Sequence, residues 1–143
     1  MLFQLDEKNN EIRITNKFTS KSASEIGVKE KNVENWIANN PQLIFPNEEI
    51  LVIGQSIAGK SMADVLALDT SGNLIIVEIK RDWSNRKTIG QLLEYASSLK
   101  DASYSFLAEK IDEYDKLQEK SLYQKFVDFT DREDFPKEEI GEH

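Results

Sequence analysis

The chain has 143 residues with 26 acidic and 18 basic side chains, and its net charge at pH 7 is −8. It contains no Cys, which excludes disulfides, Cys-based zinc sites and thiol catalysis. Its one His is the final residue, His143, so we do not expect chemistry that depends on a histidine acid or base.

The length predicts one domain that is large enough to build a hydrophobic core. No apolar run approaches the roughly 18 residues that cross a bilayer, and the N-terminus does not look like a signal peptide. We therefore expect no membrane partner and a cytoplasmic location.

The negative charge is concentrated at the C-terminal end. Residues 101–143 hold 13 acidic and 6 basic residues, a net charge of −7, whereas residues 1–100 hold 13 acidic and 12 basic residues, a net charge of −1. A strongly negative chain disfavours a polyanionic partner. That argument is weaker for the first 100 residues, because they are almost neutral.

Hydrophobic patterns predict a single α/β domain in three parts, residues 1–28, 29–100 and 101–143. The expected elements are, in chain order, a hairpin with arms at 2–5 and 11–15, a connector at 16–28, a helix at 29–39, a strand at 49–55, a hairpin at 62–80, a helix at 85–100 and a helical stretch at 107–128 with a break near 120. We expect the acidic residues 130–143 to be poorly ordered or loosely helical.

Helical periodicity also predicts which side chains face the core. In the helix at 85–100 the expected core stripe is Ile89, Leu92, Leu93, Ala96 and Leu99. In the stretch at 107–128 the expected anchors are Leu107, Ile111, Tyr114, Leu117, Leu122, Phe126 and Val127.

The hairpin at 62–80 contains the strongest functional pattern. A polar turn, Asp-Thr-Ser-Gly-Asn, joins its two arms. The second arm is apolar on both faces until its end, which is typical of a central strand. Because side chains repeat every second residue in a strand, Glu78 and Lys80 share one face.

The register of this hairpin decides where its acidic residues meet. If Leu68 pairs with Leu74 across the turn, Asp64 lies opposite Glu78. Two carboxylates so close repel each other unless a cation or a proton lies between them. Carboxylate oxygens suit Mg²⁺ or Mn²⁺, so the pattern predicts a metal site with Lys80 beside it. A register shift of one residue would separate the two acids.

A second motif competes with this one. The stretch Gly54-Gln-Ser-Ile-Ala-Gly-Lys-Ser61 matches the phosphate-binding pattern G-x-x-x-x-G-K-[ST], which requires a helix directly after the loop. The polar turn begins eight residues after Ser61 and leaves little room for that helix. A nucleotide-binding loop remains an alternative, and it is tested by whether residues 60–69 form a helix or a strand.

In this chain Asp64 is followed, after 13 intervening residues, by Glu78-Ile79-Lys80. This pattern resembles the signature of the PD-(D/E)xK nuclease superfamily. The similarity to the NucS-like and RecB-like branch covers about residues 30–100. Three further matches are a helix with Glu34 that ends in Asn40-Pro41, the pair Gly59-Lys60, and a helix with Gln91 and Tyr95. The chain departs from the family at Ala63, where Pro is usual, and at Lys60, where Arg is usual.

The resemblance implies a restriction-endonuclease-like core, which is a mixed central sheet flanked by helices, and a DNA nuclease that depends on Mg²⁺ or Mn²⁺. It implies that Asp64 and Glu78 hold the metal with help from the Ile79 carbonyl. Lys80 would position or activate water during metal-assisted hydrolysis of a phosphodiester.

The resemblance also implies supporting residues, each of which has a plainer interpretation. Glu34 is either a further metal ligand or a surface acid. Gln91 and Tyr95 either support the site and contact the substrate or form an ordinary helix flank. The expected phosphate contacts, each of which could equally be a solvated surface charge, are Lys60, Arg81, Arg86 and Lys87.

DNA is the partner that this interpretation predicts. A catalytically inactive relative that binds DNA or protein is the second alternative. Two questions stay open at this stage. One is whether the chain forms a homodimer, and the other is whether a further C-terminal domain follows, since in the family a segment like residues 126–143 leads into another strand.

Overall fold

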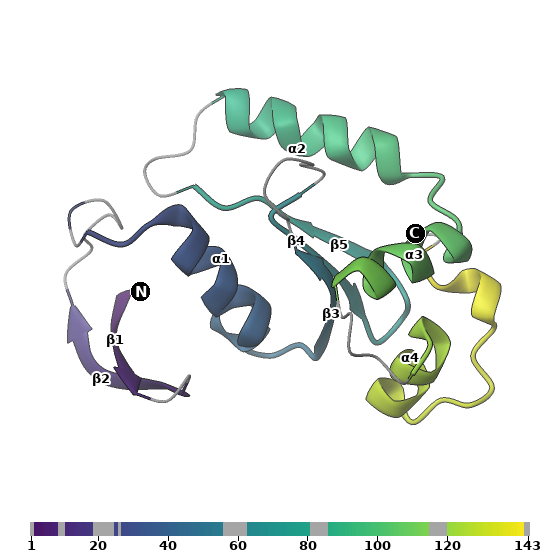
Figure 1. Cartoon of the computed structure of the whole chain (residues 1–143), viewed down its shortest axis with the longest axis horizontal. Helices are drawn as coiled ribbons and strands as arrows, with labels where there is room; N and C mark the ends of the chain where they lie inside the picture. Colours follow the sequence, from purple (N-terminus) through teal and green to yellow (C-terminus); the bar gives the residue numbers. More distant parts are fainter. Residues whose placement is uncertain are drawn as a thin grey trace.

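The computed structural model describes residues 2–8, 11–18, 25, 27–55, 63–80, 86–114 and 120–141, with the backbone alone in the N-terminal hairpin. Figure 1 shows the arrangement of the elements. These are β1 (Leu2–Lys8), β2 (Glu11–Phe18), α1 (Glu30–Asn39), the 3-10 turn η1 (Pro41–Leu43), β3 (Ile50–Gln55), β4 (Val65–Asp69), β5 (Leu74–Val77), α2 (Arg86–Leu99), α3 (Tyr104–Tyr114), α4 (Leu122–Thr130) and the 3-10 turn η2 (Lys137–Glu139).

The N-terminal hairpin is confirmed, and both of its strands are longer than predicted. β1 and β2 pair antiparallel and form a two-stranded sheet of their own. The hairpin lies beside α1, on the side away from the second sheet (Figure 1).

The second sheet has the strand order β3-β4-β5, and both of its strand pairs are antiparallel. The sequence predicts a mixed sheet, so the described strands correct that detail. The predicted register of the β4–β5 hairpin is confirmed, because Leu68 pairs with Leu74 and Val65 pairs with Val77.

Side chains of the polar turn hold this hairpin closed. The Asp69 carboxylate accepts hydrogen bonds from the backbone N–H groups of Ser71 and Asn73, at 2.8 and 2.9 Å. Gly72 adopts a φ of 83°, a left-handed conformation that costs Gly little. The turn chemistry therefore sets the register, and the register sets which residues meet at the open end of the hairpin.

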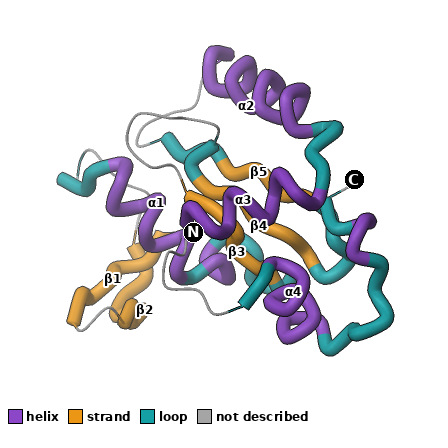
Figure 2. Tube along the Cα trace, turned by 45° about the vertical axis from the view of Figure 1, so that its right-hand side comes forward, coloured by secondary structure: helices purple, strands orange, loops and turns teal. Residues whose placement is uncertain are grey.

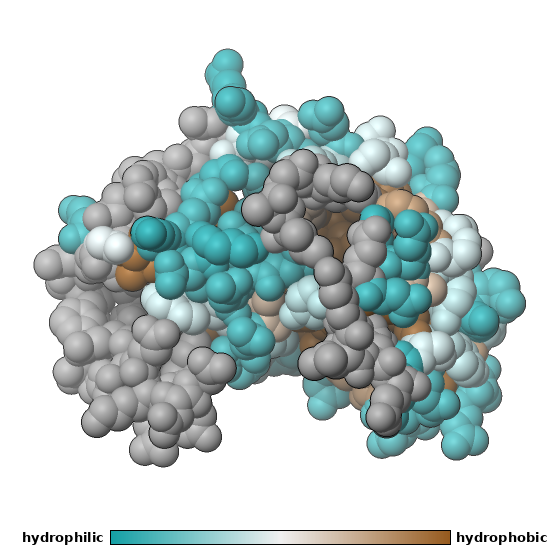
Figure 3. All heavy atoms as spheres, viewed as in Figure 1, coloured by the Kyte–Doolittle hydropathy of each residue, from teal (hydrophilic) through white to brown (hydrophobic). Residues whose placement is uncertain are grey.

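Helices cover both faces of this sheet (Figures 1 and 2). On one face α1 packs through Ile37 and Ala38 against Val65 and Ile79. On the other face lies the larger core, which α3 and α4 cover. Its buried members are Ile53, Leu66, Leu68, Leu99, Leu107, Ile111, Leu122, Phe126, Phe135 and Ile140. The outward side of α1 carries hydrophilic side chains in the space-filling view (Figure 3).

The predicted break between the last two helices is confirmed. Ser121 caps the N-terminus of α4, where its side chain accepts a hydrogen bond from the Gln124 N–H at 3.3 Å. The anchors predicted for this region are buried at five positions and half-buried at Tyr114, while Leu117 lies outside the described residues.

The predicted core stripe of α2 is wrong at four of its five positions. Leu99 is buried, but Ile89, Leu92 and Leu93 are 58, 37 and 64% exposed, and Ala96 is exposed too. The half-buried residues of this helix are Thr88, Gln91 and Tyr95. α2 therefore turns a mainly polar side inward, and among the described elements it packs chiefly on β5, with Leu99 at its C-terminal end in the main core.

Between α4 and residue 141 the chain forms turns and the short η2, which agrees with the loosely helical alternative of the prediction, but this segment packs on the core. Phe135 and Ile140 are buried in the main core, at 6 and 0% exposure. The Gly141 N–H donates a hydrogen bond of 2.8 Å to the Gly72 carbonyl in the β4–β5 turn. Two apolar side chains in an acidic stretch are enough to dock it. No helix in the described ranges is long and apolar enough to cross a membrane.

Candidate active site

Asp64 and Glu78 lie at the open end of the β4–β5 hairpin. The ladder ends at the pair Val65 and Val77, so the two acids are the next residues in that register, one before β4 and one after β5. Asp64 Oδ2 accepts a hydrogen bond from the Ile79 N–H at 2.5 Å. The carboxylate thus joins the two chain segments beyond the last strand pair.

Lys80 is the cation of this site. Its Nζ lies 2.5 Å from Glu78 Oε1, and the Glu78 side chain is only 4% exposed. The same nitrogen lies 3.8 Å from Glu30 Oε1 on α1. The predicted sharing of one side by Glu78 and Lys80 is therefore realised as an ion pair.

The first turns of α1 bring two more carboxylates to the site. Glu30 reaches Lys80, and Glu34 is buried at 7% exposure, with its carboxylate 2.6 Å from Lys31 Nζ. Sequence reasoning considered Glu34 but missed Glu30. The sequence could have indicated Glu30, because Glu30 and Glu34 are four residues apart and such residues lie on the same side of a helix.

The electrostatics show an excess of negative charge around Asp64. Burial raises the pKa of the Asp64 carboxyl, and the charges of Glu78 and Glu34 raise it further. The Ile79 N–H and Lys80 act in the opposite direction without cancelling the rise. The charges of Glu78 and Glu34 therefore both act on the Asp64 carboxyl.

Lys80 is held in its charged form by these acids. Burial on its own lowers the pKa of Lys80, but the hydrogen bond with Glu78 and the charges of Glu78, Asp64 and Glu30 outweigh burial, so the pKa is raised. A lysine whose pKa is raised in this way stabilises negative charge better than it accepts a proton.

The donor set fits a hard divalent cation. Asp64 and Glu78 offer carboxylate oxygens, and Mg²⁺ is commonly held by one or two carboxylates together with water. Within the described ranges, no three acidic or imidazole side chains are grouped so that they would hold a metal ion by themselves. A bound Mg²⁺ or Mn²⁺ would thus take Asp64 and Glu78, and the carbonyl of Ile79, which directly follows Glu78, could add a third oxygen.

The other predicted residues lie on α2 or outside the described residues. Gln91 and Tyr95 face inward on α2, which packs over β5. Arg86 and Lys87 are exposed at the start of that helix. Lys60 and Arg81 lie outside the described residues.

The phosphate-loop alternative fails the test that the sequence set for it, over the part of residues 60–69 that the structure describes. Residues 65–69 form strand β4, where that alternative requires a helix. Gly54 and Gln55 end strand β3, and the rest of the motif up to Ser61 lies outside the described residues.

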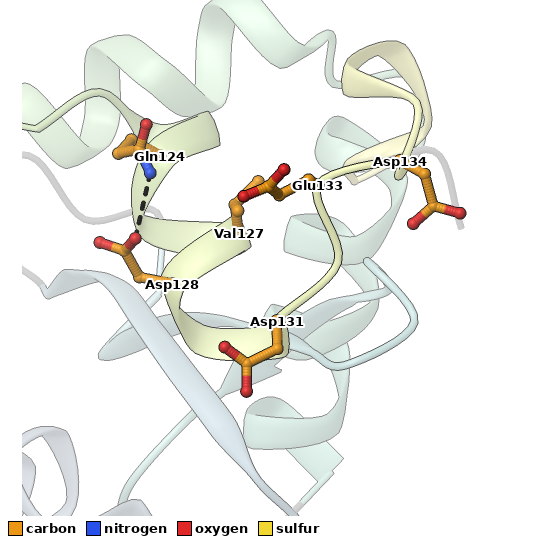
Figure 4. Close-up of a pocket in the computed structure, with 6 residues that line it drawn as sticks. All are labelled: Gln124, Val127, Asp128, Asp131, Glu133 and Asp134. Carbon is orange, nitrogen blue, oxygen red and sulfur yellow. Dashed lines mark hydrogen bonds between the residues drawn. The ribbon is translucent and has the colours of Figure 1, made fainter.

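A separate acidic hollow lies at the end of α4 and is unrelated to Asp64 and Glu78. Figure 4 shows its lining, which is Gln124, Val127, Asp128, Asp131, Glu133 and Asp134. Two of these lining residues are joined by a hydrogen bond of 3.0 Å, which the Gln124 side chain donates to the Asp128 carboxylate. All four acids are exposed, so water can solvate them and no ligand is required.

Comparisons with known proteins add no identification: no family model matches the chain, and neither the curated proteins nor the solved structures include a significant match. The functional argument therefore depends on the geometry of the site.

Proposed function

We propose that this chain is a Mg²⁺- or Mn²⁺-dependent nuclease that hydrolyses phosphodiester bonds in DNA, with a core of the restriction-endonuclease-like kind. The observation that carries the proposal is the hairpin register, which brings Asp64 and Glu78 together with Lys80 bound to Glu78. A chance cluster of surface charges would not be expected to bury Glu78 to 4% exposure.

The residues have separate roles in this proposal. Asp64 and Glu78 hold the cation, which when bound polarises a phosphoryl oxygen and activates water. Lys80 orients the attacking water and stabilises the charge that develops on the phosphate. Glu30 holds the Lys80 ammonium from the side of α1. Gln91 and Tyr95, on the inward side of α2, contact the DNA backbone.

A cleavage assay with Mg²⁺ or Mn²⁺ on single-stranded, duplex and branched DNA tests the proposal. We expect Asp64→Ala and Lys80→Ala to lower the cleavage rate by about 100-fold or more, since each removes a group that acts in the transition state. Lys100→Ala is the matched control, because the Lys100 side chain is 69% exposed and forms a surface ion pair with Asp101 at 3.7 Å. It should retain the wild-type rate.

Two outcomes would contradict the proposal. One is cleavage that survives both site substitutions. The other is salt-sensitive DNA binding by a wild-type chain that does not cleave, which would favour the inactive binding module.

A further inference from the structure

Lys80 contacts two carboxylates that come from different elements of the fold. Its Nζ lies 2.5 Å from Oε1 of Glu78, which directly follows β5, and 3.8 Å from Oε1 of Glu30, the first residue of α1. The Glu78 side chain is 4% exposed, whereas the Glu30 side chain is 41% exposed. Lys80 therefore lies between an almost buried acid and an acid that water still reaches.

The Glu78 carboxylate needs a positive charge beside it. Burying a carboxylate costs free energy unless a cation compensates it, and Lys80 supplies that positive charge. Glu78 is also one of the two acids that the proposed function assigns to the metal. Lys80 and a divalent cation would thus share one carboxylate, where their positive charges repel each other.

We propose that Lys80 is a counter-ion that a divalent cation displaces from Glu78, and that Glu30 is the positioning residue that receives the displaced ammonium. This inference rests on the proposed function. A charge-assisted hydrogen bond is about 2.8 Å long, so the ammonium needs to move by only about 1 Å to form one with Glu30, which it now faces at 3.8 Å. The flexible four-carbon stem of lysine allows such a shift.

The packing of α1 keeps Glu30 within reach of Lys80. Ile37 of this helix belongs to the same core cluster as Ile79, the residue between Glu78 and Lys80. Close packing in that cluster holds the segment that carries both groups against the helix. A carboxylate has about four acceptor sites, so Glu30 can receive the ammonium and keep its other contacts.

The plainer interpretation is that Glu30 acts only as a surface charge, which attracts any cation from a distance. Loss of Glu30 would then weaken metal binding by the same factor whether or not Lys80 is present. In the exchange, loss of Glu30 matters only while there is an ammonium to receive. A double-mutant cycle on metal affinity separates the two interpretations, and it needs no catalysis.

The experiment is calorimetric titration of the full chain with Mn²⁺. We expect Glu30→Gln to weaken Mn²⁺ binding by about fivefold or more, because the displaced ammonium loses its acceptor and competes more strongly for Glu78. In a Lys80→Met background the same substitution should change the affinity by less than about twofold. No ammonium is left to displace there, and water screens the direct attraction of the partly exposed Glu30.

Glu48→Gln is the matched control. Glu48 is exposed before β3, and its substitution removes the same charge, so the affinity should change by less than about twofold in both backgrounds. Lys80→Gln serves as a second neutral variant. Loss of the lysine leaves the almost buried Glu78 without this cation, and the amide of Gln can still donate a hydrogen bond to it. Circular dichroism checks that each variant is folded.

The outcomes are distinguishable. An equal or larger loss of affinity for Glu30→Gln in the Lys80→Met background, or no loss in either background, would overturn the exchange. So would Mn²⁺ binding by the Lys80→Met variant but not by wild type. The nuclease proposal stands in each of these cases, provided that Asp64→Ala abolishes binding. Absence of Mn²⁺ binding in wild type and in both Lys80 variants, or binding that survives Asp64→Ala, would overturn both proposals.

Discussion

Asp64 has two opposing effects on the stability of the folded state. Its hydrogen bond from the Ile79 N–H closes the end of the hairpin, which favours the folded state. Its negative charge is half-buried near Glu78 and Glu34, which disfavours the folded state. A carboxyl group whose pKa is raised by burial and by neighbouring acids is typical of a functional site.

This balance predicts that Asp64→Asn stabilises the chain at neutral pH. The folded-state pKa of Asp64 is raised above its usual 3.8, so the folded chain binds this proton more tightly than the unfolded chain does. The free energy of unfolding therefore falls as pH rises from 3.8 through the raised pKa. Asn removes the charge and can still accept from Ile79, so we expect the melting temperature at pH 7 to rise by about 1–3 °C, allowing for screening by water.

The pH dependence of this difference is the decisive measurement. Thermal melts of both proteins should converge below pH 3.8, where Asp64 is protonated in either state. Asp101→Asn is the control, since the Asp101 side chain is 86% exposed, and it should leave the melting temperature almost unchanged. A lower melting temperature for Asp64→Asn at pH 7 would mean that the hydrogen bond outweighs the charge.

Among the helices and strands, α2 is the element whose hydrophobic periodicity predicts the wrong buried side. Its apolar residues recur at helical spacing, yet Ile89 and Leu93 are more than half exposed and the half-buried side chains include Gln91 and Tyr95. A hydrophobic stripe identifies the side of a helix that prefers burial. It cannot tell where the rest of the chain will place that helix, and α2 contacts the sheet mainly through β5.

The orientation of α2 predicts that two leucines, both assigned to the core by the sequence pattern, contribute unequally to the free energy of unfolding. Leu99→Ala should lower the free energy of unfolding by about 2–4 kcal/mol, because Leu99 is 2% exposed in the main core. Leu93→Ala should change it by less than about 0.5 kcal/mol, because Leu93 is 64% exposed. Urea unfolding of both variants measures the difference, and equal losses would show that Leu93 is buried in solution.

At the scale of the whole molecule, the C-terminal segment closes the core. Phe135 packs against Phe126 with ring centres 4.9 Å apart and ring planes tilted by 56°, and Ile140 is fully buried. Gly141 has a φ of 86°, and a Cβ there would lie 2.2 Å from a Leu107 methyl carbon. The segment therefore fits closely against α3 and α4, although most of its residues are charged or polar.

This packing predicts that a single apolar residue near the end of the chain matters for the stability of the whole domain. Ile140→Ala should lower the free energy of unfolding by about 2–4 kcal/mol, through lost burial and the cavity left behind. Glu138→Ala is the control, since Glu138 is exposed two residues earlier and its loss should cost less than about 0.5 kcal/mol. Urea unfolding curves compare the two variants, and a small effect of Ile140→Ala would mean that the segment is undocked.

The sequence by itself determined the features that depend on neighbours along the chain. The polar turn at 69–73 specified the pairing of Leu68 with Leu74, and Asn40-Pro41 specified the end of α1. From that register alone, Asp64 could be placed opposite Glu78. Local chemistry was sufficient because turn geometry and strand alternation act over only a few residues.

Only the tertiary structure decided the features that depend on distant partners. It brought Glu30 to Lys80 across 50 positions of sequence, turned the apolar side of α2 outward and docked Ile140 in the core. These outcomes follow from how whole elements pack, and the free energy of burial depends on what lies opposite a side chain rather than on the residue alone. That is why the acid pair and Lys80 could be found in the sequence, whereas the contact of Glu30 with Lys80 could not.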